Sequence, residues 1–441
     1  MKSILLFGAG KSTTSLIDYL GKTCNEKNWK LYICDANLSL ALSKSSPFSC
    51  AEAISFDITN TEKRQQLILQ TDIVISMLPP AFHFLIAKDC LAFSKNLLTA
   101  SYIDTNVRSL SDEIEAKGLL FLNEMGLDPG IDHMSAMKII NEIKSQGGTI
   151  TSFKSHCGGL ISPESDDNPW HYKITWNPIN VVAAGSSGAF YKKNGEIVEV
   201  LYSRVFADEK QLVEVPTIGS LEWYANRDSL SYIDTYQLHG ISTFIRTTLR
   251  YPSFCRGWNK IVHLDLTNKN DHEEIKNCKS FDDWFELKKE KLLQNETGID
   301  ESVFFDSEFL EQVDFLGLRS EEKLPEPVLN SGSLLQYVLE KNLAMKPADK
   351  DMVIMLHEIE FSINGKNKQT RSCLIVKGHD KTHTAMAKTV GLPLGIAATL
   401  ILENKINVTG LHIPVIPEIY EPVLKELELN GVKFNEKTSN T

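Results

Sequence analysis

Short apolar runs alternate with helical stretches along the first third of the chain, and this alternation constrains the fold more than any other feature. The gaps between the runs carry apolar residues at helical spacing, as in Leu16, Ile17 and Leu20. Strands that alternate with helices favour a parallel sheet covered on both faces. The sequence therefore predicts an α/β fold that contains a Rossmann-type, doubly wound domain. The predicted strands are Ser3–Phe7, Lys30–Cys34, Ala53–Phe56, Asp72–Met77, Leu97–Ala100 and Leu119–Leu122.

A glycine turn follows the first predicted strand. Gly8 and Gly10 stand between this strand and a helix that begins near Ser12, where such a domain binds the pyrophosphate of a dinucleotide. Thr13 replaces the third glycine of the usual motif. A phosphate-binding NTPase loop is excluded, because Leu5 stands where that loop needs its first glycine.

Two acidic residues follow the next strands. Asp35 ends the second predicted strand, where a carboxylate accepts hydrogen bonds from the adenosine ribose and repels a 2′-phosphate. No lysine or arginine follows before Lys44, so the residues favour NAD over NADP. The alternative is that Asp35 only begins a turn. Asp57 is expected either to bound the adenine pocket or to cap the helix from Thr61.

Composition and charge exclude several classes of protein. The 441 residues carry a net charge of −11, which argues against a nucleic-acid-binding surface. The first residues lack the apolar segment of a secretion signal, and the apolar stretch near Val390–Leu402 is too short for a membrane span. We therefore expect a soluble cytoplasmic protein without a membrane partner. The eight cysteines show no C-x-x-C spacing, and no metal site is predicted.

Polar, glycine-rich segments follow the fifth and sixth predicted strands, at the edge where doubly wound folds bind ligands. The segment after the sixth strand and four later ones, in this order, closely resemble saccharopine dehydrogenase of the glutamate-forming type. The resemblance runs from the glycine turn almost to the last residues. The matching segments are NEMGLDPGIDHMSAMKII, SHCGGLISPESDDNPWHYKITW, YANRDS, IRTTLRY and TAMAKTVGLPLGIAATLIL.

This resemblance implies a hydride transfer. The substrate would be saccharopine, which would be oxidised with NAD to an imine that hydrolyses to L-glutamate and 2-aminoadipate 6-semialdehyde. Asp35 would place the chain with the NAD-using members of lysine degradation. The alternatives are an NADPH-dependent saccharopine reductase of lysine biosynthesis, another carboxyalkyl-amine dehydrogenase such as carboxynorspermidine dehydrogenase, and a catalytically silent NAD-binding protein. The resemblance also implies a homodimer.

The resemblance assigns acid–base work to Asp128, Tyr102 and Cys157. A general base works best with a pKa near the working pH, which burial could give Asp128. Asp128 could instead only form the turn before Pro129, and Cys157 could be a small buried residue. Tyr102 is better suited to positioning the substrate than to acting as a base, because a free tyrosine has a pKa of about 10.

Saccharopine carries three carboxylates, so an acidic protein must supply local cations. Arg227, Arg246 and Arg250 are the candidates, because guanidinium groups bind carboxylates in a bidentate manner, but Arg250 could equally be a structural ion-pair partner. The expected substrate-binding residues are Ser101, Tyr102, Asp128, Arg227, Arg246, Thr247 and Thr248. The expected cofactor-binding residues are Gly8, Gly10, Lys11, Ser12, Asp35, Asp57, Ile58, Met77, Leu78, Pro79, Leu127, Pro129 and Trp176.

The chain is expected to divide into three regions. Residues 1–127 with 385–441 would form the dinucleotide-binding domain, and residues 128–270 with 352–384 a mixed α/β substrate domain. Residues 271–351 would form a small helical insertion. His83, His133 and His156 stand alone in the sequence and are interpreted as structural residues.

Overall fold

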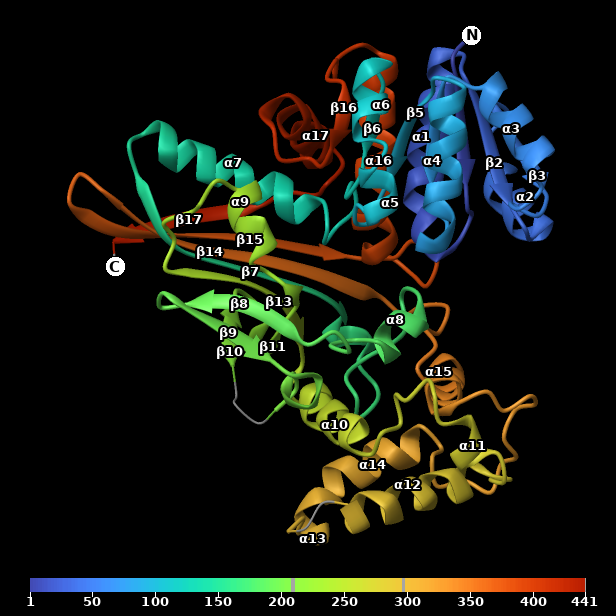
Figure 1. The fold of residues 1–441 in the computed structure, drawn as a ribbon, viewed down its shortest axis with the longest axis vertical. Coiled ribbons are helices and arrows are strands. Elements are labelled where there is room, and N and C mark those ends of the chain that lie inside the picture. The colour runs from blue at the N-terminus through green and yellow to red at the C-terminus, as the bar shows by residue number, and fades with distance from the viewer. Residues whose placement is uncertain (208–210, 296–297, 441) are drawn as a thin grey trace. The chain divides into compact units, whose positions relative to one another are not determined.

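The computed structural model describes residues 1–207, 211–295 and 298–440. Contacts divide the chain into two compact units, and each is assembled from segments that are distant in the sequence (Figure 1). Unit 1 comprises Met1–Thr149, Leu374–Gly378 and Thr382–Asn435. Unit 2 comprises Ile150–Cys373, His379–Lys381 and Glu436–Thr441.

A parallel sheet forms the centre of unit 1. Its strand order is β16-β6-β5-β4-β1-β2-β3, which confirms the predicted α/β fold with a doubly wound domain. The central strands β1 and β4 are buried along their whole length and mostly apolar, because helices cover both faces of such a sheet. The strands are β1 (Ser3–Phe7), β2 (Lys30–Asp35), β3 (Ala51–Ser55), β4 (Ile73–Ser76), β5 (Asn96–Thr99), β6 (Leu120–Leu122) and β16 (Gly410–His412).

The helices of unit 1 come from both ends of the chain. Late helix α16 packs on early helix α1, and in Figure 1 its red ribbon lies among blue and cyan elements. Gly391 allows this close approach, because a Cβ atom there would lie 2.8 Å from the carbonyl oxygen of Ser12. The helices are α1 (Thr14–Lys27), α2 (Leu38–Ser45), α3 (Thr61–Gln70), α4 (His83–Ala92), α5 (Thr105–Arg108), α6 (Ser111–Ala116), α7 (Ile131–Ser145), α16 (Ala385–Leu402) and α17 (Pro417–Leu429).

Unit 1 contains a buried ion pair and one long apolar helix. Arg64 on α3 and Asp89 on α4 form a buried ion pair with an N–O distance of 2.6 Å, and Gln65 donates a second hydrogen bond to Asp89. Among the helices of the described residues, α16 alone has the length and apolar composition of a membrane span. Because 89% of its apolar window is buried inside the protein, the same composition also suits a core helix.

The boundaries of the units differ from the expected domain limits at two places. Helix α7 packs against α17 and belongs to unit 1, so the first unit extends to Thr149 rather than ending at residue 127. Strand β17 (Asn435–Asn440) is added beside β15 in the sheet of unit 2, so the last residues do not stay with the dinucleotide-binding fold. Both differences arise from packing between elements far apart in the sequence.

A ten-stranded mixed sheet forms the centre of unit 2. Its main path is β10-β11-β13-β7-β14-β15-β17, with β8, β9 and β12 at its side. Strands β13 and β7 are parallel, whereas β11 pairs with both β10 and β13 in antiparallel fashion. The strands are β7 (Thr149–Ile161), β8 (Ala189–Lys193), β9 (Glu196–Val200), β10 (Leu212–Val215), β11 (Gly219–Ala225), β12 (Arg227–Asp228), β13 (Thr243–Arg250), β14 (Asp351–Ile363), β15 (Lys366–Lys377) and β17.

Helices surround an aromatic core in unit 2. Trp170 is fully buried there, and its indole nitrogen donates a 2.9 Å hydrogen bond to the carbonyl oxygen of Gln312 on α14. Figure 1 shows helices α10 to α15 gathered at one end of the unit, and residues 271–351 lie within this group. The helices are α8 (Pro178–Val182), α9 (Ser231–Thr235), α10 (Pro252–His263), α11 (His272–Ile275), α12 (Phe281–Asn295), α13 (Glu301–Phe304), α14 (Ser307–Phe315) and α15 (Ser331–Asn342).

Candidate functional site

The glycine turn of unit 1 lies at the carboxyl end of β1. Gly8 has a φ of +98°, and a Cβ atom there would lie 2.8 Å from the carbonyl oxygen of Met77, so this position requires glycine. Gly10 is exposed, and an added Cβ would meet no atom within 4 Å. The turn leads into a short 3₁₀ segment, Lys11–Thr13, and then into α1. The backbone beside Gly10 is therefore open to a ligand.

Asp35 holds this turn in place. One of its carboxylate oxygens accepts a 2.7 Å hydrogen bond from the backbone N–H of Ala9, and the other accepts a 2.8 Å bond from that of Asn37. Lys44 reaches the same turn, where its ammonium group donates to the carbonyl oxygen of Gly10 at 2.5 Å and to Thr13 Oγ1 at 3.0 Å. Burial lowers the pKa of Lys44 to about 8. The turn thus carries a cation close to its exposed backbone.

The remaining cofactor candidates of unit 1 lie on the loops after the strands. Asp57 is exposed and accepts hydrogen bonds from the N–H and hydroxyl of Thr59, and these bonds lower the pKa of its carboxyl. Asn60, rather than Asp57, caps α3. Lys11 and Pro79 are exposed, and the half-buried candidates here are Ser12, Ile58, Met77 and Leu78.

A buried histidine joins the ends of β4 and β5. His83 Nδ1 lies 2.9 Å from Ser76 Oγ, and its Nε2 lies 2.7 Å from Ser101 Oγ. Burial lowers the pKa of His83 from 6.5 to about 4, so the ring is neutral near pH 7. A neutral histidine has one donor and one acceptor nitrogen. The tautomer of His83 therefore decides whether the Ser101 hydroxyl hydrogen is used by the ring or available to a ligand.

Asp128 lies on a tight loop before α7. The loop contains a cis peptide bond between Asp128 and Pro129, and the N–H of Gly126 donates to the carbonyl oxygen of Pro129 at 3.0 Å. Gly130 has a φ of +146°, and a Cβ atom there would lie 2.1 Å from the carbonyl oxygen of Gly126. Asp128 is half-buried, whereas Leu127 and Pro129 are buried.

Three buried titratable residues support this loop. His133 Nε2 lies 2.9 Å from Glu124 Oε2, and its Nδ1 lies 3.6 Å from Asp132 Oδ2. Asp132 also accepts a 2.6 Å hydrogen bond from the N–H of Gly130 at the start of α7. Glu124 accepts from the N–H of Ile103, next to the half-buried Tyr102. The cluster therefore ties the segment after Ser101 to the segment that carries Asp128.

In unit 2, one face of the sheet gathers three of the expected residues. Thr248 on β13 pairs with Cys157 on β7, and Arg246 lies two residues before Thr248 on the same strand. Side chains alternate along a strand, so these three project from one face. Arg246 is 3% exposed, and its guanidinium carbon lies 4.3 Å from the centroid of the Tyr232 ring. Cys157 is buried.

Thr247 lies on the opposite face. Its hydroxyl is hydrogen-bonded to His156 Nδ1 at 2.7 Å, and His156 is the residue that pairs with it across β7 and β13. The structure therefore does not bring Thr247 together with Arg246 and Thr248.

The other candidates of unit 2 lie in different surroundings. Arg227 is exposed in β12, and its φ of +50° places it in the left-handed region. Trp176 is half-buried and donates through its indole N–H to the hydroxyl of Tyr172 at 3.1 Å. Arg250 is buried against the rings of Tyr172 and Phe254, which suits a structural residue. Within residues 1–207, 211–295 and 298–440, no three His, Cys, Asp or Glu side chains gather in a way that could hold a metal ion.

Comparison with known proteins identifies the family. Residues 4–122 match the sequence profile described as "Saccharopine dehydrogenase NADP binding domain", and residues 126–432 match "Saccharopine dehydrogenase C-terminal domain". The chain belongs to the saccharopine dehydrogenase family. The resemblance inferred from the sequence motifs is thus confirmed.

Relatives of the chain fall into two groups. "Saccharopine dehydrogenase [NADP(+), L-glutamate-forming]" of Saccharomyces cerevisiae is 33% identical, with 99% of both chains covered. The solved structure titled apo histidine-tagged saccharopine dehydrogenase (L-Glu forming) from the same yeast matches all of both chains, with a TM-score of 0.88 and 31% identity. "Alpha-aminoadipic semialdehyde synthase" of Arabidopsis thaliana is 31% identical over 98% of this chain, which spans only 44% of that protein's length.

The expectation that NAD is the cofactor is wrong. The profile that matches residues 4–122 describes an NADP-binding domain, and the yeast relative is named for NADP(+). The structure gives the physical reason. Both carboxylate oxygens of Asp35 accept backbone hydrogen bonds, so a carboxylate at this position supports the turn and does not by itself indicate a contact with a ribose. Lys44, remote in the sequence, brings a positive charge to the turn.

Proposed function

We propose that this protein oxidises saccharopine to L-glutamate and 2-aminoadipate 6-semialdehyde with NADP. The observation that carries the proposal is the match to the yeast enzyme, because it extends over 99% of both chains and is accompanied by the same fold. The reaction consumes saccharopine, oxidised cofactor and water, and it releases the two products, reduced cofactor and a proton. Location in the cytoplasm and assembly as a homodimer remain predictions from the sequence.

The residues around the glycine turn suit a phosphate-bearing dinucleotide. Gly10 leaves open space beside its backbone, and the Lys44 ammonium lies at the same turn. We assign the pyrophosphate to Gly8, Gly10 and the segment Lys11–Thr13, and the negative charge of an additional phosphate to Lys44. When bound, the cofactor accepts the hydride.

In unit 1, Asp128 is the candidate for the acid–base step. The secondary amine of saccharopine must lose its proton before hydride leaves the adjacent carbon, and a carboxylate can accept that proton. The loop fixes the position of this carboxylate through the hydrogen bond that the N–H of Gly126 donates to the carbonyl oxygen of Pro129. Ser101, held by His83, and Tyr102 are assigned to bind the polar groups of the substrate.

In unit 2, the cations for the substrate carboxylates are Arg246 and Arg227. The contact with the ring of Tyr232 helps to hold the buried guanidinium group of Arg246 on this face of the sheet, and a guanidinium group is suited to bind a carboxylate. Cys157 and Thr248 lie on the same face of the sheet as Arg246 and supply small polar groups there. Thr247 has no place in this assignment, because it binds His156 on the other face.

Initial-rate assays with saccharopine test the proposal directly. We expect reduced cofactor to form with NADP and far more slowly with NAD, and we expect one molecule of glutamate for each molecule of reduced cofactor.

Asp128→Asn should lower kcat by about two to four orders of magnitude, which is the usual contribution of a positioned acid or base. Asp104→Asn, at the half-buried cap of α5, is the matched control for this change of charge. Absence of turnover with either cofactor would refute the proposal.

A further inference from the structure

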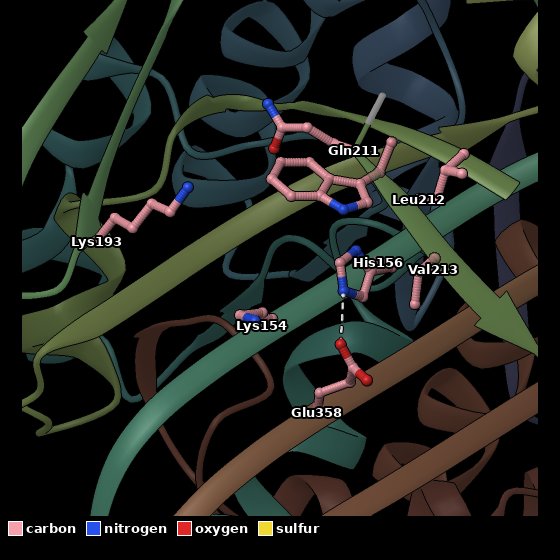
Figure 2. A pocket seen from close by; sticks show the side chains of 8 residues that line it. Lys154, His156, Lys193, Gln211, Leu212, Val213 and Glu358 are labelled. Carbon is pink, nitrogen blue, oxygen red and sulfur yellow. Dashed lines mark ion pairs between the residues drawn. The ribbon is translucent and has the colours of Figure 1, made fainter. Parts of the chain in front are cut away.

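A hollow of about 530 Å³ opens on the sheet of unit 2 (Figure 2). Its walls come from five strands and from the residue before one of them. Lys154 and His156 lie on β7, Lys193 ends β8, Trp223 lies on β11 and Glu358 lies on β14. Gln211 and the first residues of β10 complete the lining. None of these residues belongs to the site assigned above.

The hollow lies on the face of the sheet opposite to Arg246. His156 pairs with Thr247, and the next residues along both strands, Cys157 and Thr248, pair with each other. Successive side chains project to opposite faces, so His156 and Cys157 face away from each other. The 2.7 Å hydrogen bond between His156 and Thr247 fixes this orientation. A ligand in the hollow would therefore not occupy the position assigned to saccharopine.

The floor of the hollow is formed by polar side chains whose charges largely cancel. His156 is 1% exposed, with Nδ1 bound to Thr247 and Nε2 3.4 Å from Glu358, as the dashed line in Figure 2 shows. Arg371 Nε lies 3.2 Å from the other oxygen of Glu358. The negative charge of Glu358 is thus compensated within the floor, and the floor contributes little net charge to a ligand.

Two lysines give the hollow a positive charge. Lys154 is half-buried and Lys193 is exposed. Neither ammonium group forms an ion pair or a hydrogen bond with any residue that the structure describes. Several other lysines of unit 2 are paired with carboxylates, as Lys173 is with Asp349 at 2.7 Å. Although the protein has a net charge of −11, two such ammonium groups beside one hollow make it a locally positive region that attracts anions.

The other walls limit the shape of a ligand. The indole ring of Trp223 lies 5.8 Å from the ring of His156, measured between centroids, and gives one side of the hollow a flat apolar wall. Figure 2 shows the Lys193 and Gln211 side chains extending on the side of His156 away from Glu358. The Gln211 amide can donate to an oxygen atom. These groups match a compact molecule with charged oxygens and an uncharged body.

We propose that this hollow is a second ligand site, which binds a small organic anion with at least two carboxylate or phosphate groups. Lysine ammonium groups act as point charges and do not select the planar carboxylate over the tetrahedral phosphate. Two such groups favour an anion with two charges. Trp223 covers the body of the ligand, while His156 and Glu358 keep the floor rigid.

Titration calorimetry of the full chain, without substrate or cofactor, tests the proposal. Citrate and inorganic pyrophosphate are the two probes, and the comparison between them separates carboxylate from phosphate ligands. Lys154→Gln with Lys193→Gln should weaken the binding of the preferred probe by about tenfold or more, because charge-assisted hydrogen bonds are lost. Lys192→Gln is the matched control, since Lys192 is adjacent on β8 and projects to the other face. We also expect binding to change the tryptophan fluorescence of the protein, and Trp223→Phe should remove this change.

Three outcomes would overturn the proposal. The first is no binding of either probe at millimolar concentration. The second is unchanged affinity in the double lysine variant, which would place the ligand elsewhere, including the glycine turn. The third is an equal loss in Lys192→Gln, which would indicate general charge attraction. Because the titration needs no turnover, its result does not depend on whether saccharopine is the substrate.

Discussion

His83 should make unit 1 sensitive to mild acid. Its imidazole is buried and hydrogen-bonded to Ser76 and Ser101, and burial lowers its pKa from 6.5 to about 4. The unfolded chain therefore binds a proton at this residue at a higher pH than the folded chain does. The contribution of His83 to the free energy of unfolding is fully present above pH 6.5, and it is lost as the pH falls from 6.5 towards 4.

The size of the effect follows from the two pKa values. A shift of one pKa unit corresponds to about 1.4 kcal/mol. Between pKa values of 6.5 and about 4, the loss in the free energy of unfolding is about 2 kcal/mol at pH 5 and about 3 kcal/mol at pH 4. Losses of this size are a large fraction of the stability of an ordinary domain.

Urea unfolding across a pH series measures this loss. His83→Gln removes the titrating ring and keeps a side chain that can reach Ser101, so its stability should fall less steeply between pH 6.5 and 4 than that of the wild type. The difference between the two curves should approach about 3 kcal/mol at the acid end. His412→Gln on β16 of the same sheet is the matched control, because it leaves the buried chain of hydrogen bonds intact. Parallel curves for wild type and His83→Gln would refute the reasoning.

Three other substitutions test the structure. Gly8→Ala should raise KM for the cofactor and lower stability by about 1–3 kcal/mol, because of the positive φ and the close Met77 carbonyl; thermal unfolding and initial rates measure both. Lys44→Met should raise KM for NADP about tenfold while KM for saccharopine stays the same; equal effects on both would contradict the assignment. Arg64→Met should lower stability by about 3–5 kcal/mol by leaving Asp89 buried without its cation, and a smaller loss in a second variant that also replaces Asp89 would support this cause.

The fold of unit 1 could be predicted largely from the sequence, because its strands are short apolar runs in a regular alternation. Strand β16 could not, since its three residues, Gly410–His412, show no apolar run and are added to β6 from nearly 300 residues away. The pairing of β17 with β15 escapes prediction for the same reason, because the polar sequence of Asn435–Asn440 has no strand pattern. Both elements are determined by long-range pairing.

The candidate site could be predicted less completely. From the sequence His83 is an isolated structural residue, because the neighbours that give it a role, Ser76 and Ser101, follow two different strands. The alternation of side chains along β13 separates Thr247 from Arg246, but only once the strand is recognised. For Asp35 the sequence predicts a functional role where the structure shows a structural one, since its carboxylate accepts a hydrogen bond from the backbone of the turn.

The packing of α16 against α1 has a consequence for synthesis of the protein. A ribosome releases α1 first, whereas α16 and the edge strand β16 follow only after nearly all of unit 2. Until then the apolar face of α1, including Leu16 and Leu20, lacks its partner helix. Residues 1–149 should therefore fold poorly when produced alone, and the nascent chain should depend on chaperones until residues 382–435 emerge.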